Sequence, residues 1–426
     1  MKLLIRNGNL IDPTGEVSGI QDILVEDGVI VKLFPQLEDP DAEIIDGEGL
    51  CVCPGLVDPH VHLRDPGFTD KEDICTGTAA AAHGGFTTIA CMPNTKPVAD
   101  TPEILQYILE QAKCGSGVRV YPIGAVSVGE QGTVCTNFAA LKEAGAVALS
   151  DDGVPIMNAA LMREALQKAN CCGLPLLCHE EDRELVQNFG VNEGKISRQL
   201  GIPGRPAIAE ELMVARDGML SLETGVPVHF CHISTAGSVA IIRALKQAGA
   251  AVTCETCPQY FTLTEEAVLE QGSLARVNPP LRTKRDVAAI LEGLRDGTID
   301  CIATDHAPHT AEEKARTLTE APSGMVGLET ALGIALTELY HSGVLELTEV
   351  IRKMTSDPAR VLGLKSGQIA IGEAADLTLF DLNEKWVIDP TKFCSKGRNT
   401  PFADRSVRGK VKYTIVSGRI VYRCTP

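Results

Sequence analysis

Short apolar runs that alternate with helical patterns restrict the fold of this chain more than any other feature. Eight such runs lie between residues 51 and 303, and segments rich in Ala, Leu and Glu follow them, as at 159–169, 239–247 and 287–295. Parallel strands that are buried on both faces have continuous apolar sequences of this kind. Eight strand–helix units predict an α/β fold with a closed (β/α)8 TIM barrel over residues 54–363. The runs are 51–57, 87–92, 118–124, 146–149, 174–178, 226–231, 251–254 and 300–303.

The two ends of the chain have a different pattern, with short strand-like segments separated by glycines. Residues 1–53 contain such segments at 3–5, 23–25 and 29–31. Residues 364–426 contain further ones at 368–370, 377–380, 411–416 and 419–422. Both patterns are typical of small antiparallel strands with tight turns. Because neither end has enough strands for a sheet by itself, we expect both ends to form one small β-sandwich domain beside the barrel.

Composition excludes several classes of function. The 426 residues include 39 Lys and Arg against 56 Asp and Glu, a net charge of −17, and no basic cluster occurs. Binding to nucleic acid or to an acidic membrane surface is therefore not expected. The longest apolar runs are far shorter than the ~20 residues of a membrane span. Charged residues and a glycine interrupt the first residues before an apolar segment as long as that of a signal peptide can form. A cytoplasmic protein is therefore expected.

Fifteen cysteines form an odd set without the spacing of a disulfide framework. Most lie inside apolar runs, where cysteine acts as a small hydrophobic residue. The CxxC segment at 254–257 lacks the second CxxC of a zinc ribbon. We expect all fifteen to be reduced thiols.

Histidine and aspartate gather where the apolar runs end. In a (β/α)8 barrel the carboxyl ends of the strands carry the active site. Five of the nine histidines follow such runs, which a scattered distribution would not produce. Two of them, His60 and His62, are two residues apart on an extended chain, so both side chains leave the same face. The complete set is His60, His62, His179, His232 and His309, together with Asp152 and Asp305.

These side chains predict a metal centre. Imidazole suits zinc, and carboxylates complete a charged site. Without His309, six ligands remain. They are too many for one tetrahedral ion, but they suit two ions ~3.5–4 Å apart that share a bridging carboxylate and a bridging hydroxide. Asp152 is the expected bridge, while the adjacent Asp151 points away if the segment is extended. By similar arguments we expect four histidines to lie outside the metal centre: His83, His229, His306 and His341.

A centre of this kind predicts hydrolysis of an amide-type carbonyl. A water between two metals loses a proton near neutral pH, and Asp305 can pass that proton to a leaving nitrogen. Arg64 follows the second histidine by two residues, and its guanidinium can hold a substrate carboxylate through two parallel hydrogen bonds. Asn94 and Asn278 each adjoin a proline. A turn role is therefore an alternative to a substrate contact for both asparagines.

The chain resembles the amidohydrolase superfamily, and specifically the dihydroorotases, over nearly its whole length. The resemblance rests on Asp-Pro-His-Val-His-Leu-Arg at 58–64, on Ala-Thr-Asp-His-Ala-Pro-His at 303–309 followed by Lys314, and on the glycines and Ala-Asp-Leu at 367–377. It implies zinc-dependent, reversible cyclisation of N-carbamoyl-L-aspartate to dihydroorotate, the third step of pyrimidine synthesis. In the reverse direction, the bridging hydroxide would attack the ring amide and Asp305 would act as general acid and base.

The resemblance also implies a role for each site residue. His60, His62 and Asp305 would hold the first zinc, His179 and His232 the second, and Asp152 would bridge both. The substrate would contact seven residues. Arg64, Asn94 and His309 would hold its carboxylate, Asn278 and the backbone of Ser323 and Gly324 would hydrogen-bond the ring, and His62 would also contact the substrate.

One departure from many relatives concerns the bridge. They use a carboxylated lysine at the end of the fourth strand, whereas residues 146–153 contain no lysine. The sequence therefore looks like the bacterial dihydroorotases with a bridging aspartate. Since aspartate is shorter than a carboxylated lysine, binding of the second zinc is expected less strongly than binding of the first. The closest alternatives are a hydantoinase or an allantoinase, and the absence of the lysine disfavours both. The presence of Arg64 favours a substrate with a free carboxylate instead. An inactive scaffold is a further alternative, although all six ligands are present.

Three features outside the centre remain. Residues 310–324 follow the last strand and form either a solvated loop or a lid that closes over substrate. A homodimer is the default oligomeric state. The family resemblance also implies association with aspartate transcarbamoylase.

Overall fold

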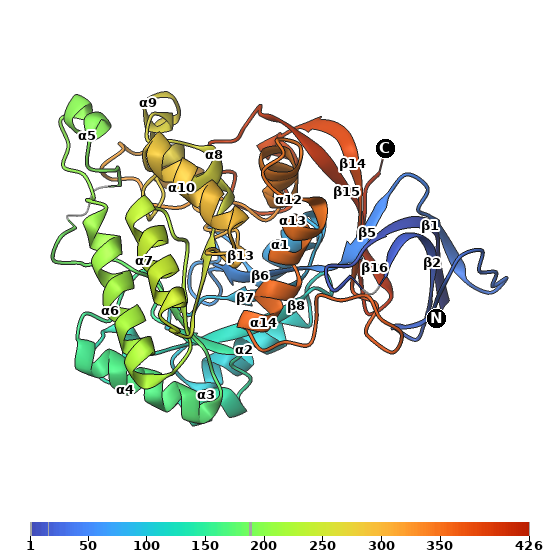
Figure 1. Ribbon diagram of the computed structural model, residues 1–426, viewed down its shortest axis with the longest axis horizontal. Helices are drawn as coiled ribbons and strands as arrows, with labels where there is room; N and C mark the ends of the chain where they lie inside the picture. Colours follow the sequence, from blue (N-terminus) through green and yellow to red (C-terminus); the bar gives the residue numbers. More distant parts are fainter. Residues whose placement is uncertain (1, 16, 187–189, 426) are drawn as a thin grey trace.

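The computed structural model describes residues 2–15, 17–186 and 190–425. A barrel and a separate small sheet lie side by side, and both chain ends belong to the small sheet (Figure 1). Among the helices of these described residues, none combines the length and the apolarity that a bilayer crossing demands. The predicted combination of a (β/α)8 barrel with a second β unit from the chain ends is confirmed.

Eight parallel strands form the barrel, and they follow one another around it in sequence order. A bridge between Val61 and His306, together with a 2.8 Å hydrogen bond from the His62 amide to the His306 carbonyl, joins the last strand region to the first. The strands are β6 (Leu56–Val61), β7 (Phe86–Cys91), β8 (Arg119–Ala125), β9 (Ala148–Ser150), β10 (Leu176–Cys178), β11 (Val228–Phe230), β12 (Val252–Thr256) and β13 (Cys301–Ile302).

Helices surround the barrel, and the predicted helical segments lie in three of them, α4, α7 and α10. The local signals are ordinary ones: the Asn158 side chain caps the first turn of α4, and Gly173 ends it in the left-handed conformation. The helices are α1 (Ile74–His83), α2 (Pro102–Ala112), α3 (Phe138–Glu143), α4 (Ala159–Cys172), α5 (Lys195–Leu200), α6 (Ile208–Thr224), α7 (Ala236–Gln247), α8 (Pro258–Thr262), α9 (Ala267–Gln271), α10 (Lys284–Arg295), α11 (Ala311–Lys314), α12 (Ala331–Ala335), α13 (Leu347–Lys353) and α14 (Ser356–Val361), with short turns η1 (Val128–Glu130), η2 (Gly272–Ala275), η3 (Leu336–Tyr340) and η4 (Pro390–Lys392).

The small sheet is one branched, hydrogen-bonded sheet with its own apolar core. Its strand β1 pairs with β2 on one side and with β4 and then β5 on the other. Antiparallel pairing of β5 with β14 joins the two chain ends. The strands are β1 (Lys2–Ile11), β2 (Ser18–Glu26), β3 (Val29–Phe34), β4 (Glu43–Asp46), β5 (Cys51–Pro54), β14 (Leu377–Val387), β15 (Ser406–Val416) and β16 (Arg419–Arg423).

Two details of the strand prediction are corrected. The run 51–57 is not one barrel strand, because β5 belongs to the small sheet and β6 to the barrel. Gly55 lies at the division, where a Cβ atom would approach the Thr87 hydroxyl to 2.1 Å, so only glycine fits between the two sheets. Residues 368–370 form no strand, although Ile369 is buried in the core of the small sheet. The limits 1–53, 54–363 and 364–426 stay predictions.

Candidate metal centre and substrate site

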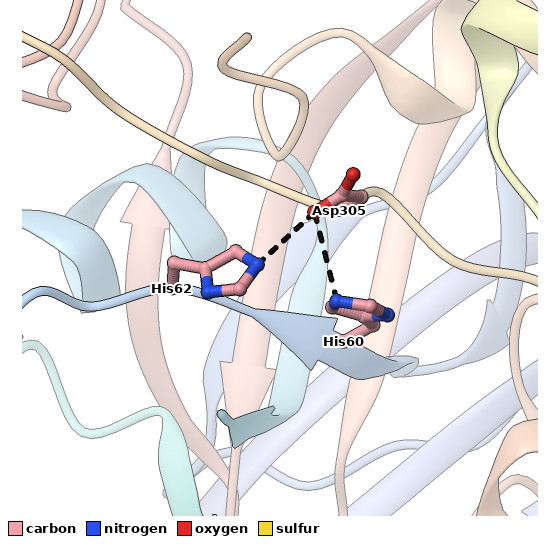
Figure 2. A group of neighbouring side chains, drawn as sticks. All are labelled: His60, His62 and Asp305. Carbon is pink, nitrogen blue, oxygen red and sulfur yellow. Dashed lines mark hydrogen bonds and ion pairs between the residues drawn. The ribbon is translucent and has the colours of Figure 1, made fainter. Parts of the chain in front are cut away.

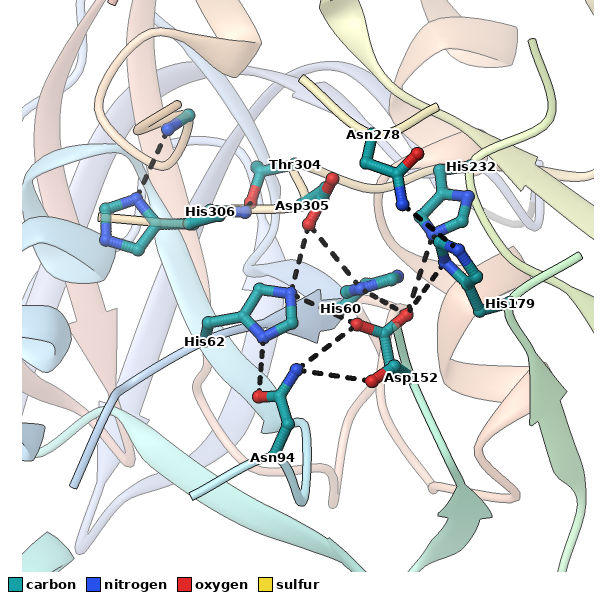
Figure 3. A network of polar contacts seen from close by, with 12 residues as sticks. His60, His62, Asn94, Asp152, His179, His232, Asn278, Thr304, Asp305 and His306 are labelled. Carbon is teal, nitrogen blue, oxygen red and sulfur yellow. Dashed lines mark hydrogen bonds and ion pairs between the residues drawn. The ribbon is translucent and has the colours of Figure 1, made fainter. Parts of the chain in front are cut away.

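The six predicted metal ligands converge at one end of the barrel (Figure 3). Each lies at or just beyond the carboxyl end of a strand: His60 and His62 at β6, Asp152 after β9, His179 after β10, His232 after β11 and Asp305 after β13. All six residues are at most 7% exposed. Parallel strands deliver their ends to one rim, which explains how residues so distant in sequence meet.

His60, His62 and Asp305 form the first group (Figure 2). Asp305 Oδ1 lies 3.1 Å from His62 Nε2 and 3.6 Å from His60 Nε2. The second carboxylate oxygen of Asp305 points away from both imidazoles (Figure 2). Asp305 has a φ of +48°, a strained conformation for a residue with a side chain, and such strain is common at functional sites.

Asp152 lies between the first group and a second one formed with His179 and His232. Its Oδ1 atom is 3.5 Å from His60 Nε2, 3.6 Å from His179 Nδ1 and 3.6 Å from His232 Nε2. Its Oδ2 atom is 3.5 Å from His62 Nε2. The two distal histidines approach each other to 2.8 Å through His179 Nδ1 and His232 Nε2. One carboxylate therefore contacts all four imidazoles.

The donor set fits divalent cations. Four imidazoles and two carboxylates are ligands that zinc accepts. His60 Nε2 and Asp152 Oδ1 are buried and have no hydrogen-bond partner among the described residues, an arrangement that is costly unless another group satisfies them. The separations of 3.5–3.6 Å around Asp152 Oδ1 are too long for good hydrogen bonds. They match the distance of about 3.3–3.5 Å between neighbouring ligands of a tetrahedral zinc ion.

Electrostatics also favour positive charge in this centre. Burial opposes protonation of His60, but the Asp152 carboxylate raises the pKa of this histidine well above its usual value. Burial also lowers the pKa of His179, but Asp152 and Glu181 outweigh this effect and raise the pKa to about 10. Burial would favour a neutral Asp152, yet the surrounding histidines hold its pKa well below the usual range. The carboxylate therefore stays ionised, as a metal ligand must be.

Glu255 is a residue of the centre that the sequence analysis missed. It lies in β12, is fully buried, and accepts hydrogen bonds from His60 Nδ1 at 2.8 Å and from His229 Nε2 at 3.1 Å. Burial disfavours its charge, but the two histidines lower its pKa to about 2. The sequence does contain a signal for it, because Glu255 directly follows the apolar run 251–254. A carboxylate buried in a barrel is costly unless it has a partner.

Asp58 and Thr304 tie the first strand to the last at this rim. The Asp58 carboxylate accepts hydrogen bonds from the amides of His60 and Thr304 and from the Thr304 hydroxyl. Burial raises the pKa of Asp58 to about 7. These contacts hold the backbone on both sides of the His60–Asp305 pair.

The three neighbours that we expected to lie outside the centre make other contacts. The Asp151 carboxylate accepts hydrogen bonds from the amides of Val126 and Ser127. His306 Nε2 lies 3.3 Å from a Glu72 oxygen. His229 packs in the barrel, where it contacts Glu255 rather than the centre itself.

Arg64 and His309 form the next layer outward. Arg64 has a φ of +61°, its Nε donates to the Pro308 carbonyl at 3.3 Å, and its Nη2 lies 3.5 Å from His309 Nε2. His309 Nε2 donates to the Ser323 carbonyl at 2.8 Å. Burial and the Arg64 charge lower the pKa of His309 to about 3. A neutral imidazole beside a guanidinium leaves a net positive charge there.

Gly324 and Lys314 anchor the segment 310–324. Gly324 has a φ of +136°, and a Cβ atom there would approach His309 Nε2 to 3.0 Å. The buried Lys314 Nζ donates to the carbonyls of Gly324 and Pro322 at 3.0 Å each, and to that of Arg276 at 3.3 Å. The segment is thus tied to the loop before Asn278, and its movement as a lid stays a prediction.

Both asparagines contact ligand candidates. Asn94 Oδ1 accepts from His62 Nδ1 at 3.0 Å, and its Nδ2 lies 3.5 Å from Asp152 Oδ2. Asn278 Nδ2 lies 3.3 Å from His179 Nε2, and its Oδ1 accepts from Arg205. Both amides therefore orient imidazoles as well as facing the site (Figure 3).

Comparisons with known proteins agree with this geometry. Residues 49–238 match a family described as Dihydro-orotase-like, and residues 237–422 match the Amidohydrolase family. The dihydroorotase of Acetivibrio thermocellus is 50% identical over 421 residues, covering 99% of both chains. That of Pelotomaculum thermopropionicum is 51% identical over 423 residues, covering 99% of this chain and 98% of the relative. The solved L-hydantoinase of Arthrobacter aurescens superposes with a TM-score of 0.89 at 27% identity, covering 99% of this chain and 96% of that one. The chain therefore belongs to the dihydroorotase family of the amidohydrolases.

Proposed function

We propose that this protein interconverts N-carbamoyl-L-aspartate and dihydroorotate. The observation that carries the proposal is the convergence of four histidines and two aspartates at one barrel rim, in a chain about half identical to curated dihydroorotases along its whole length. Hydantoinase structures share the fold at lower identity. They support a cyclic amidase in general, while the dihydroorotase relatives favour this substrate.

The metal ligands in this proposal are the six convergent residues. His60, His62 and Asp305 would hold one cation, His179 and His232 the other, and Asp152 would contact both. We propose zinc for both, because imidazole nitrogens dominate the set. Bound there, the cations would supply polarisation of a carbonyl oxygen and a lowered pKa for water.

Asp305 would move the proton. In ring opening, water adds to the amide carbonyl carbon, the bond from this carbon to the ring nitrogen breaks, and the nitrogen gains a proton. Asp305 Oδ1 is engaged with His60 and His62, whereas its second oxygen faces away from them (Figure 2). That second oxygen would take the proton from water and deliver it to the nitrogen. Ring closure reverses both transfers.

Arg64 would hold the substrate carboxylate. Its guanidinium keeps donors beyond the one given to Pro308, and the adjacent His309 is neutral. Two parallel hydrogen bonds would fix the ring as well as its charge. Ser323 and Gly324, joined to His309 and Lys314, would present backbone groups to the ring beside Asn278.

The test is an activity assay with metal analysis. Purified protein, after chelation and after reconstitution with zinc, is offered dihydroorotate, hydantoin and allantoin. Zinc-dependent opening of dihydroorotate, with little activity on the other rings, is the expected result. A preference for hydantoin or allantoin would contradict dihydroorotate as the substrate. Metal binding without any hydrolysis would favour an inactive scaffold. Association with aspartate transcarbamoylase is tested by co-sedimentation of the two purified enzymes.

A further inference from the structure

The connection between strands β14 and β15 leaves the small sheet and reaches the rim of the barrel. Both strands extend from the small sheet toward α12, and β15 contacts this helix (Figure 1). We call residues 394–400 of the connection the rim segment. The amides of Cys394 and Ser395 donate to the Glu329 carboxylate of the barrel at 2.8 Å and 3.3 Å. A part of the β14–β15 connection therefore belongs to the barrel rim.

Asn399 of the rim segment joins two barrel loops through three side-chain hydrogen bonds. Its Nδ2 donates to the carbonyls of Ala307 and Gly324, at 3.1 Å each. Its Oδ1 accepts from the His309 amide at 3.0 Å, and its backbone carbonyl accepts from the Val326 amide at 2.9 Å. Both N–H groups and the oxygen of the carboxamide are thus in use. Asn399 is 3% exposed, so these bonds are made away from bulk water.

The two loops joined by Asn399 carry the groups that would hold the substrate. In the first loop, 307–309, the bonds from Asn399 lie on both sides of Pro308. The Pro308 carbonyl accepts from Arg64 Nε at 3.3 Å, so its position influences where the guanidinium lies. The second loop, 323–326, contains the backbone groups proposed to face the ring. One side chain therefore links both halves of the proposed substrate site.

We propose that Asn399 is a positioning residue of the substrate site. It holds the two loops at the separation at which Arg64 and the backbone groups of the second loop meet one carboxylate-bearing ring. This inference rests on the proposed function, because it concerns binding of the same substrate. Among the described residues, the Asn399 side chain hydrogen-bonds to none of the six metal-ligand candidates. Its effect should therefore fall on substrate binding rather than on metal binding or proton transfer.

The local sequence lets the rim segment pass close to the first loop. A Cβ atom at Gly397 would lie 2.6 Å from Pro308 Cβ and 2.9 Å from Asn399 Oδ1, so a larger residue would displace both. The Gly397 amide donates to Ser395 Oγ at 3.1 Å, which holds the turn of the chain. The short asparagine side chain then spans the remaining distance. A carboxylate of the same shape would have no donor for the two carbonyls.

Steady-state kinetics test the role of Asn399. Asn399→Ala removes all three side-chain bonds, whereas Asn399→Asp keeps the acceptor for the His309 amide and loses both donors. In both variants we expect KM for dihydroorotate to rise at least about 10-fold, with kcat within about threefold of wild type. Zinc content should equal that of wild type. If Asn399→Ala does not fold, as judged by circular dichroism, Asn399→Asp carries the same test.

Glu329→Gln is the matched control. Glu329 anchors the same rim segment through the amides of Cys394 and Ser395, but it lies outside the two loops that Asn399 joins. We expect its KM to stay within about twofold of wild type. Equal increases in KM for Glu329→Gln and Asn399→Ala would assign the effect to the segment as a whole and overturn the role of Asn399.

A double-mutant cycle separates positioning from a general loss of packing. In an Arg64→Ala background, Asn399→Ala should raise KM further by less than about twofold, because the guanidinium that it positions is already absent. Residues that act independently would instead multiply their effects. A combined increase equal to the product of the two single increases would overturn the proposal, as would a fall in kcat at unchanged KM.

Hydrogen–deuterium exchange without substrate tests the loops themselves. Peptides that cover 307–309 and 323–326 should exchange faster in Asn399→Ala than in wild type or Glu329→Gln. Unchanged exchange would overturn the proposal. Dihydroorotate turnover by wild type tests the proposed function separately. If wild type opened no dihydroorotate, the proposed function would fail, whereas the exchange measurement would still decide whether Asn399 fixes the two loops.

Discussion

Glu255 lies directly behind His60, with its carboxylate oxygen 2.8 Å from Nδ1 of the imidazole. The glutamate is fully buried, and its other oxygen meets His229 Nε2 at 3.1 Å. Because the Nδ1–H group of His60 donates a hydrogen bond to Glu255, the imidazole lone pair is on Nε2. This nitrogen faces Asp152 and Asp305. Carboxylates in this position orient metal-binding histidines and increase their basicity.

Replacing Glu255 with glutamine should therefore weaken metal binding. The amide keeps the shape of the carboxylate but removes its charge and one acceptor, so we expect zinc affinity to fall about 10–100-fold. Competition with a chromogenic chelator measures the affinity without reference to turnover. Glu72→Gln is the matched control, because Glu72 is also fully buried and contacts a histidine, His306, outside the ligand set. Equal losses in both variants would assign Glu255 a general structural role.

Removing one distal histidine should lower the metal content by one ion. In the proposed ligand set His232 belongs to the second group, and its Nε2 lies beside Asp152 and His179. His232→Ala is therefore expected to retain one zinc per chain after reconstitution and dialysis, measured by elemental analysis, whereas wild type retains two. His341→Ala, whose imidazole contacts the Leu382 carbonyl, should match wild type. A variant that still holds two ions would remove His232 from the ligand set.

The alternation of apolar runs and helical patterns was enough to predict the barrel, but it did not assign each strand to its sheet. The run 51–57 is continuous in sequence, yet it divides at Gly55 because its first half pairs with β14, more than 300 residues away. Pairing of that kind depends on the whole fold and leaves no mark in the local pattern. Ile369 shows the reverse case, since it is buried without belonging to a strand.

At the centre, spacing and strand ends predicted which ligand candidates meet, because parallel strands bring their ends to one rim. Glu255 and Asp58 were missed as supporting residues. Both support the site from inside the barrel rather than from its mouth, and only the position of His60 reveals their role. Likewise, the sequence motif placed Asn94 beside the substrate, whereas its contacts with His62 and Asp152 emerge only in three dimensions.

Arg64→Ala should raise KM for dihydroorotate much more than it changes kcat. Hydrogen bonds to a charged partner contribute about 1.5–3 kcal/mol, so an increase of roughly 10–100-fold in KM is expected. Arg64→Lys should recover little, because a lysine cannot form two parallel hydrogen bonds to a carboxylate. Steady-state kinetics separate the two constants. Arg163→Ala on α4 is the control, and a fall in kcat at constant KM would contradict a binding role.

Asp305→Ala should abolish turnover. General acid–base catalysis contributes about 10²–10⁴-fold, and the loss of a ligand candidate adds to this effect. The expected pattern is a fall in kcat of at least about 10³-fold, measured at saturating zinc and dihydroorotate. Near-normal turnover would remove Asp305 from the proton transfer.

Glu130, at the end of η1, should make stability depend on pH. It is only 8% exposed, and one of its oxygens has no hydrogen-bond partner among the described residues. Burial, reinforced by the charges of Asp151 and Asp152, raises its pKa to about 9, whereas the unfolded chain restores a value near 4.5. Between these values the folded state holds a proton that the unfolded state has lost, so this group destabilises the fold as pH rises from about 4.5 to 9.

Glu130→Gln removes this titration while keeping a neutral side chain of the same shape. The stability of the variant relative to wild type should therefore increase with pH across that window, by at most ~1.4 kcal/mol per pH unit, and stay constant below it. Thermal unfolding of both proteins at one scan rate, across the same pH range, measures the difference. Glu110→Gln, at an exposed position on α2, should show no such trend. A difference for Glu130→Gln that is flat, or that falls with pH, would mean that Glu130 is ionised in the folded protein and would contradict the prediction.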